Sequence, residues 1–261
     1  ILNNLGAIYQ ALGENQKALD CYDQRLQLSR ALRDRRGEAT TLNNVGIVYD
    51  KIGEKQKALE YFDQSIALHR AVGDRRGEAG ALSNVGAVYE SLGERQKALD
   101  CYNRSLPLRR VVGDRRGEAT TLNNIGKLYD SPGAEQRALD YYNQSLALSR
   151  TVGDRDGESN TLNNIGIIYE NLGERQKALD YYNLALTLFR ALGKRSGEAT
   201  TLSNIGVVYK KLGERQKALD CYNSSLPLYR AVGDRRGEAI ALNNIGSLYE
   251  SLGANQMAAD H

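Results

Sequence analysis

The sequence predicts an all-α solenoid made of stacked, antiparallel pairs of helices. A string close to Leu-Asn-Asn-Ile-Gly recurs every 40 residues, and a fixed period of this size is typical of repeat arrays. Apolar residues within each copy follow helical spacing, and no segment has the pattern of a strand. A short turn joins the two helical segments of each copy, so these helices should lie antiparallel.

Three residues of the repeated unit never change. They are the second Asn of the string, the Gly two places later and the Tyr three places beyond that Gly. The second Asn stands at Asn4, Asn44, Asn84, Asn124, Asn164, Asn204 and Asn244. The 261 residues hold about six and a half copies, and each copy buries its apolar face on its neighbours. We therefore expect a single array over residues 1–261, truncated at both ends.

The composition argues against several classes of protein. Charged residues make up 26% and hydrophobic residues 41% of the chain, as in ordinary soluble proteins. The formal net charge of +3 is too small to indicate nucleic-acid binding. No apolar run approaches the roughly 18 residues of a membrane span, and no signal peptide is visible. We expect a cytoplasmic protein that binds neither nucleic acid nor membrane.

The three cysteines occupy equivalent positions in different copies, at Cys21, Cys101 and Cys221. Tyrosine occupies the same position in three other copies. A position that accepts either Cys or Tyr is a packing position, so we expect thiols without a metal or redox role. An odd number of cysteines without a close pair also fits a reducing compartment.

Residues 74–113 illustrate the unit. A first helix is predicted from about Arg75 to Leu92 and a second from about Glu94 to Val112. Gly73 suits the left-handed position that follows a helix, and Asp74 can accept from the free N–H groups of the next first turn. Gly86 lies in the middle of the first helix, where glycine costs about 1 kcal/mol relative to alanine. Its recurrence in every copy predicts close approach by another helix.

A few residues depart from the pattern. Pro107 and Pro227 lie late in a second helix and each remove a backbone donor, so we expect a local kink there. Pro132 falls in the turn within a copy, where we expect no consequence. Arg33 replaces the capping Gly and Lys194 replaces the capping Asp.

A family resemblance follows from the Gly and Tyr of the first helix and the small and aromatic residues of the second, as in Gly46, Tyr49, Ala58 and Phe62. This pattern resembles the tetratricopeptide repeat, whose usual unit of about 34 residues is lengthened here. The form with Gly-Asp-Arg-Arg-Gly-Glu-Ala before Leu-Asn-Asn-Val-Gly is similar to Leu-Gly-Asn-repeat adaptors, kinesin light chains and bacterial arrays fused to signalling or protease domains. The near identity of the units favours a bacterial array.

The resemblance covers the whole chain and implies a right-handed superhelix that binds protein or peptide in its concave groove. In such superhelices the first helix lines the concave face, and the second Asn lies on it. An amide both donates and accepts, so it suits the backbone of an extended peptide whatever the peptide's side chains. Alternatively, each Asn bonds only to the neighbouring copy and fixes the helix spacing; both roles can hold.

The same face begins with a recurring arginine, at Arg36, Arg76, Arg116 and Arg236, which Asp156 and Ser196 replace in two copies. Arg in the first turn opposes the helix dipole at a cost on the order of 0.3–1 kcal/mol, and its repetition suggests a function. A free guanidinium favours carboxylate or phosphate, so we expect an acidic or mixed-charge partner. Alternatively, these residues pair with carboxylates of adjacent copies, where each exposed pair contributes little.

The position after the invariant Gly varies most, and partner specificity is expected there. Ile47, Lys127 and Ile167 are the candidates for contact with a partner. Asp50, Glu90 and Glu170, in the last turn of the first helix, should make the opposite edge of the groove acidic.

No arrangement of residues indicates an enzyme. His69 and His261 lie at unrelated positions without a recurring nucleophile nearby, and no phosphate-binding Gly loop is present. We expect neither a cofactor nor a metal. The most direct interpretation is a protein-interaction scaffold that binds an extended segment.

Two further expectations concern the surroundings of the array. The chain could be the sensor arm of a larger bacterial signalling enzyme, such as a caspase-like protease or a kinase. It starts within one copy and stops part-way through a second helix, so apolar stacking faces should be exposed at both ends. Head-to-tail self-association through these ends is therefore a further possibility.

Overall fold

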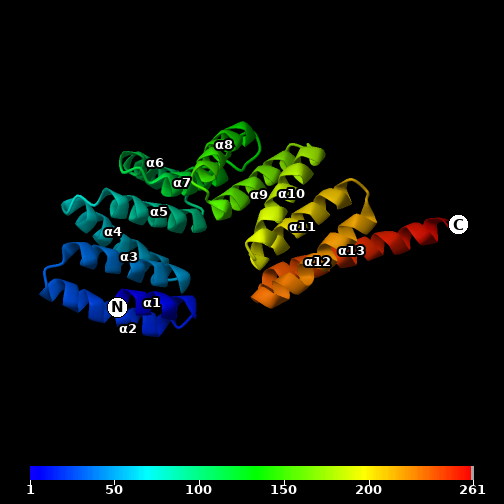
Figure 1. The fold of residues 1–261 in the computed structure, drawn as a ribbon. Coiled ribbons are helices and arrows are strands. Elements are labelled where there is room, and N and C mark those ends of the chain that lie inside the picture. Colours follow the sequence, from blue (N-terminus) through cyan, green and yellow to red (C-terminus); the bar gives the residue numbers. More distant parts are fainter. Residues whose placement is uncertain (260–261) are drawn as a thin grey trace. The chain divides into compact units, whose positions relative to one another are not determined.

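The computed structural model describes residues 1–259, with side chains described as far as Glu250. The described residues form thirteen α-helices and no strand, which confirms the predicted all-α fold (Figure 1). Each of the first six copies contributes a first helix, called A, and a second, called B, and the last copy contributes an A helix. The A helices are α1 (Leu2–Ala11), α3 (Arg35–Lys51), α5 (Arg75–Ser91), α7 (Arg115–Leu128), α9 (Arg155–Asn171), α11 (Arg195–Lys211) and α13 (Arg235–Ala259). The B helices are α2 (Asn15–Ala31), α4 (Lys55–Ala71), α6 (Arg95–Val111), α8 (Glu135–Thr151), α10 (Arg175–Ala191) and α12 (Arg215–Val232).

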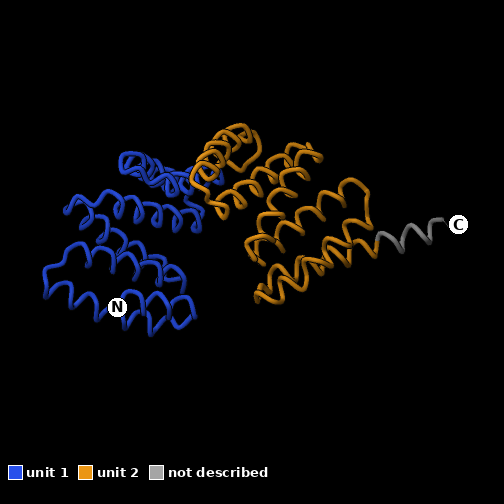
Figure 2. The backbone as a smooth tube through the Cα atoms, viewed as in Figure 1, with its two compact units in different colours: residues 1–128 blue, residues 129–261 orange. Residues whose placement is uncertain are grey.

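The chain forms two compact units, Ile1–Leu128 and Tyr129–His261 (Figure 2). Unit 1 contains α1 to α7, and unit 2 contains α8 to α13. Within each unit every helix packs against the next one, and the A helices of consecutive copies also touch. This is the arrangement of a repeat stack, in which each copy contacts only its neighbours.

Helices begin and end close to where the capping residues predict. In the copy taken as the example, α5 and α6 match the predicted ranges to within a residue at each end. Gly73 has a φ of 69°, and the Asp74 carboxylate accepts from the Gly77 N–H at 3.1 Å. Arg33, which replaces the capping Gly, is forced to a φ of 54° and is the one non-glycine residue with positive φ in the described chain.

Within the two units, the recurring core contact joins a glycine of helix A to an aromatic ring of helix B in five copies, at Gly6, Gly46, Gly86, Gly166 and Gly206. Gly86 in α5 lies under Tyr102 of α6, and a methyl group on Gly86 would lie 2.6 Å from the Tyr102 ring. Gly46 with Phe62 and Gly166 with Tyr182 repeat this contact. The rings are almost fully buried. The predicted close approach at the mid-helix glycine is therefore confirmed, and its cause is the ring rather than a second backbone.

A buried serine of helix B adds a polar link to helix A. The Ser105 hydroxyl donates to the backbone carbonyl of Ala79 at 2.8 Å, and Ser65 donates to Ala39 at the same distance. A buried hydroxyl is tolerated only when it is hydrogen-bonded. The pair of helices is thus fixed by one apolar and one polar contact.

Pro132 has a larger effect than predicted. The expectation that it lies in the turn without consequence is wrong, because α7 ends at Leu128, three residues earlier than the equivalent end of α5 at Ser91. In α5 the Leu92 N–H donates to the Val88 carbonyl, whereas proline has no N–H to donate. The freed Leu128 carbonyl instead accepts from the Arg95 guanidinium.

Pro107 and Pro227 do not end their helices, since α6 and α12 continue through them. A local kink at these prolines stays a prediction. In the last copy no separate helix B forms, because α13 runs as a single helix to Ala259. The predicted partial helix B is therefore wrong within the described residues.

Two glycines of α5 provide a test of the ring contact. Gly86→Ala should lower the free energy of unfolding by about 1–3 kcal/mol, because the added methyl group overlaps the Tyr102 ring. Gly80→Ala is the matched control, since no atom lies within 4 Å of the added group. It should raise stability by about 0.5–1 kcal/mol through helix propensity alone. Urea unfolding followed by circular dichroism measures both, and equal effects would contradict the ring contact.

Candidate protein-interaction surface

In two copies the second Asn of the repeated string donates to the first Asn of the preceding copy. Asn84 donates from Nδ2 to the side-chain oxygen of Asn43 at 2.9 Å. Asn204 donates in the same way to Asn163, at 3.3 Å. This is the spacing role that the sequence left open. Each of these two amides keeps an N–H and its carbonyl oxygen without a protein partner in the described chain.

The other members of the Asn series lie in varied surroundings. Asn124 follows a copy with Ser83 in place of the first Asn, and it lies beside the Tyr102 hydroxyl instead. Asn164 also has a partner within the structure. Asn44 and Asn244 are half-buried, and Asn4 at the start of α1 is exposed. The series therefore stays accessible from one side along each unit.

The recurring arginine is partly used between copies. Arg36 lies 3.2 Å from the capping carboxylate of Asp74 in the next copy. Arg116 also has a partner within the structure, whereas Arg76 and Arg236 are exposed and make no ion pair in the described chain. We call Arg36 and its equivalents the rim position.

One copy reverses the charges of this pair. Asp156 occupies the rim position, and Lys194 occupies the capping position of the following copy. Their side chains lie 3.2 Å apart, the same separation as in the Arg36–Asp74 pair. Both partners have changed sign together, which indicates that the contact between copies constrains the two positions.

The variable position also contacts the neighbouring copies. Ile47 and Ile167 are half-buried and pack against core clusters that include residues of the next copy. Lys127 is exposed and pairs with Glu90 of the preceding copy at 2.8 Å. The side chain at this position thus fills or bridges the boundary between copies while it keeps part of its surface open to solvent.

The acidic residue in the last turn of helix A has a structural partner. Glu90 accepts from the Tyr102 hydroxyl at 3.1 Å, and Glu170 accepts from Tyr182 at the same distance. Burial of the ring, with the adjacent carboxylate, raises the pKa of Tyr102. This bond explains why a carboxylate stands at a helix end where the dipole disfavours it.

The copy with Lys210 lacks that acceptor. The buried hydroxyl of Tyr222 consequently has no hydrogen-bond partner among the described residues, and burial raises its pKa to about 12. Lys210 donates instead to Ser247 of the next copy at 2.6 Å.

An invariant ion pair was missed by sequence reasoning. The last Arg of each helix B bonds to a Glu in the first turn of the following helix A, as Arg110 does with Glu118 at 2.7 Å. The full series is Arg30–Glu38, Arg70–Glu78, Arg110–Glu118, Arg150–Glu158, Arg190–Glu198 and Arg230–Glu238. The signal was an Arg and a Glu eight residues apart in all six copies.

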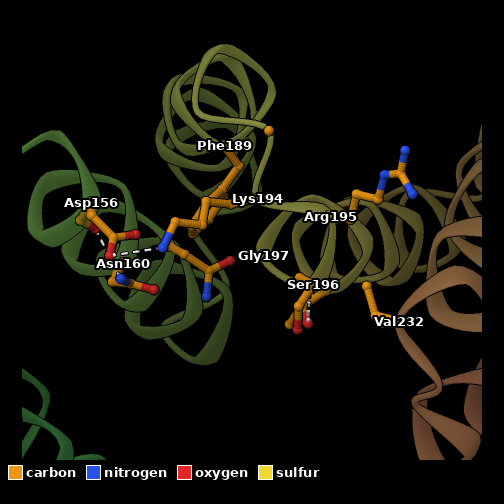
Figure 3. A pocket seen from close by; sticks show the side chains of 11 residues that line it. Asp156, Asn160, Phe189, Lys194, Arg195, Ser196, Gly197 and Val232 are labelled. Atoms are coloured by element: carbon orange, nitrogen blue, oxygen red, sulfur yellow. Dashed lines mark hydrogen bonds and ion pairs between the residues drawn. The ribbon is translucent and has the colours of Figure 1, made fainter. Parts of the chain in front are cut away.

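A pocket of about 620 Å³ lies in unit 2 at the N-terminal ends of α9 and α11 (Figure 3). Asp156 and Asn160 of α9 form one wall, and Lys194, Ser196 and neighbouring residues form the other. Phe189 and Val232 add apolar surface. The pocket therefore coincides with the two copies in which the rim position is not arginine.

The cysteines and possible metal sites offer no reactive centre. Burial raises the pKa of Cys101, and it raises that of Cys221 to about 11, which keeps both thiols protonated near neutral pH. No cluster of three metal-ligating side chains occurs in the described part of the chain. Among the described helices none is long and apolar enough to cross a membrane.

The match to a family model decides the classification. The model for the tetratricopeptide repeat matches residues 1–71, 77–151, 141–191, 157–231 and 197–261. The chain belongs to the tetratricopeptide repeat family. Membership supports a role as a protein-interaction scaffold. No curated protein sequence matches the chain.

Solved structures share the fold of this tetratricopeptide repeat array. BtubC (BKLC) from P. vanneervenii has a TM-score of 0.72 and 19% identity over 84% of this chain and 92% of its own. A Rap protein complexed with competence and sporulation factor has a TM-score of 0.69 and 15% identity over 97% and 75%. A putative kinesin light chain of Podospora anserina, with nearly identical repeats, has a TM-score of 0.57 and 16% identity over 72% and 92%. At these identities the likeness shows the fold alone.

The reversed ion pair can be tested by restoring its usual polarity. Asp156→Arg alone places a cation beside Lys194 and should lower the free energy of unfolding by about 0.5 kcal/mol. Combining it with Lys194→Asp recreates the Arg36–Asp74 arrangement and also supplies a cap for the Gly197 N–H. The double variant should be more stable than the wild-type protein by about 1 kcal/mol. Urea unfolding of all four proteins measures the coupling, and strictly additive effects would refute a direct contact.

His69 should make stability depend on pH. Its ring is buried, with Nδ1 3.2 Å from Asp74. Burial lowers its pKa more than the Asp74 and Glu78 charges raise it, and Arg36 lowers it further. The unfolded chain therefore binds the proton more readily, so stability is full above about pH 6.5 and falls as pH drops toward the folded pKa.

His69→Phe is the matching variant, since Phe189 occupies the equivalent position. Its stability should lack this fall, and the difference from wild type should change by up to about 1.4 kcal/mol per pH unit below pH 6.5. Thermal unfolding between pH 8 and pH 5 measures it. Parallel profiles for the two proteins would show that His69 does not titrate in the folded state as described.

Proposed function

We propose that this array is a scaffold that binds an extended segment of a protein partner along the face of its A helices that carries the second Asn. The observation that supports this is the unused hydrogen-bonding capacity of two members of that series. Asn84 and Asn204 each donate one side-chain N–H to the preceding copy, and their other side-chain polar atoms remain available. An extended backbone presents donors and acceptors that such amides can satisfy.

The charges along this face favour a mixed-charge partner over a purely acidic one. Arg36 is already paired with Asp74, while Arg76 and Arg236 are exposed. Lys127 adds an exposed cation that is shared with Glu90. Carboxylates of a partner would therefore be attracted at some copies only, and we expect Ile47, Lys127 and Ile167 to modulate specificity through their exposed surfaces.

The Rap protein likeness supports this direction. That protein was solved in complex with competence and sporulation factor, so a stack of this fold accommodates a bound partner. The repeat fold itself is typical of non-catalytic interaction modules, and recurring positions give a regular surface on which an extended chain can lie.

The proposal can be tested with peptides selected from a random displayed library on the wild-type protein. Asn84→Ala, Asn124→Ala and Asn164→Ala together should weaken binding of the selected peptides about 100-fold, because each lost hydrogen bond costs about 1 kcal/mol. The control combines Asn103→Ala, Asn143→Ala and Asn183→Ala, which remove exposed amides on B helices of three successive copies. It should leave the affinity unchanged.

Fluorescence polarisation measures both affinities, and circular dichroism confirms that helicity persists. Equal affinities for the two triple variants would exclude a backbone-reading role for the second Asn. Failure to select any peptide from the library would count against the scaffold function itself.

A further inference from the structure

The capping Asp of each copy has two carboxylate oxygens with separate tasks. In Asp74 one oxygen accepts from the Gly77 N–H, and the other lies 3.2 Å from Arg36. The second oxygen of Asp34 pairs with Arg25 at 2.7 Å, and that of Asp114 pairs with Arg109 at 2.6 Å. Each of these three carboxylates therefore caps a helix and also binds a cation.

Asp234 performs only the first task. It accepts from the Gly237 N–H at 2.9 Å, but no cation in the described chain pairs with it. The three possible sources of a cation are all altered in this copy. Ser196 occupies the rim position, Ser225 the position that holds Arg25 in the first copy, and Tyr229 the position that holds Arg109 in another copy.

Two of the nearby cations are engaged elsewhere, whereas Arg195 and Arg236 are exposed and make no ion pair in the described chain. Arg230 bonds to Glu238 at 2.7 Å, and Arg235 bonds to the same carboxylate at 3.1 Å. The Tyr229 hydroxyl donates to Ser203 at 3.2 Å. The half-buried Asp234 carboxylate is therefore left with an open oxygen.

Ser196 stands where other copies have an arginine. The absent arginine leaves space in the structure as well as an unpaired negative charge on Asp234. Ser196 and Val232, which lies two residues before Asp234, line one end of the pocket of about 620 Å³ (Figure 3). At the other end the reversed pair of Asp156 and Lys194 is complete. Asp234 is not itself a lining residue, but by equivalence with the Arg36–Asp74 pair an arginine at the Ser196 position would reach from this end toward its carboxylate.

We propose that this end of the pocket receives an arginine side chain from the bound partner, which pairs with Asp234 in place of the rim arginine that Ser196 replaces. The Arg36–Asp74 pair is the internal template for the geometry. Arginine suits the site better than lysine because its planar guanidinium can bond to a carboxylate with two N–H groups. The inference rests on the proposed function and specifies one residue of the partner segment.

The experiment uses two small probes, N-acetyl-arginine amide and its neutral analogue N-acetyl-citrulline amide. Titration of the isotope-labelled protein with the arginine probe should shift the NMR signals of Ser196, Val232 and Asp234, and the citrulline probe should not. Ser196→Arg supplies the missing side chain internally and should abolish the shifts. Asp234→Asn should do the same, whereas Asp74→Asn, in a copy with its own arginine, should leave them unchanged.

Shifts of equal size with both probes, or shifts that persist in Ser196→Arg, would overturn the assignment. The library-selected peptides separate this result from the scaffold function. If they bind wild type and Ser196→Arg equally well while the Asn triple variant loses them, the arginine site is refuted and the scaffold function stands. If their affinity falls at least 10-fold in Ser196→Arg and on replacement of their arginine by citrulline, the site is supported.

Discussion

The contact between a glycine of helix A and a ring of helix B is the constraint on which the rest of the structure depends. The contact between Gly86 and the Tyr102 ring sets how closely the two helices approach. That distance places the Tyr102 hydroxyl on Glu90 and the Ser105 hydroxyl on the Ala79 carbonyl. Because the interior of a protein is close-packed, even one methyl group at the glycine would displace these polar contacts together.

A second layer of contacts, between copies, is polar and adjustable. The pairs Arg36–Asp74 and Asp156–Lys194 show that the same boundary accepts either polarity. Asn84 donates to Asn43 of the preceding copy. Asn124, whose preceding copy has Ser83 at that position, lies beside the Tyr102 hydroxyl instead. Residues that first suggest ligand binding thus also hold neighbouring copies together. The copies differ in how many polar atoms of these residues remain available to a ligand.

The sequence predicted the fold, the caps and the buried glycine because local rules govern them. Gly73 can adopt the left-handed conformation after a helix without steric cost and Asp74 can cap the next first turn, and the 40-residue period shows their recurrence. The effect of Pro132 was misjudged because proline acts on the residues before it. Its absent N–H leaves an earlier carbonyl of α7 without a donor, and the helix ends early. The Arg110–Glu118 pair was missed because its partners face each other across a turn, and a sequence does not show which of several nearby charges meet. The candidate interaction surface depends on such pairings. The sequence therefore predicted which residues belong to the surface but not which neighbours those residues bond to.

The reversed pair of Asp156 and Lys194 has a consequence for how such an array can change length. Loss of the unit that begins at Lys194 would bring Asp156 against Asp234, and loss of the preceding unit would bring Arg116 against Lys194. Either event joins like charges, whereas removal of the second or third copy would not. Removing either of these two units alone would therefore cost some stability at the new boundary, whereas removing both together would join Arg116 to Asp234 and keep opposite charges in contact.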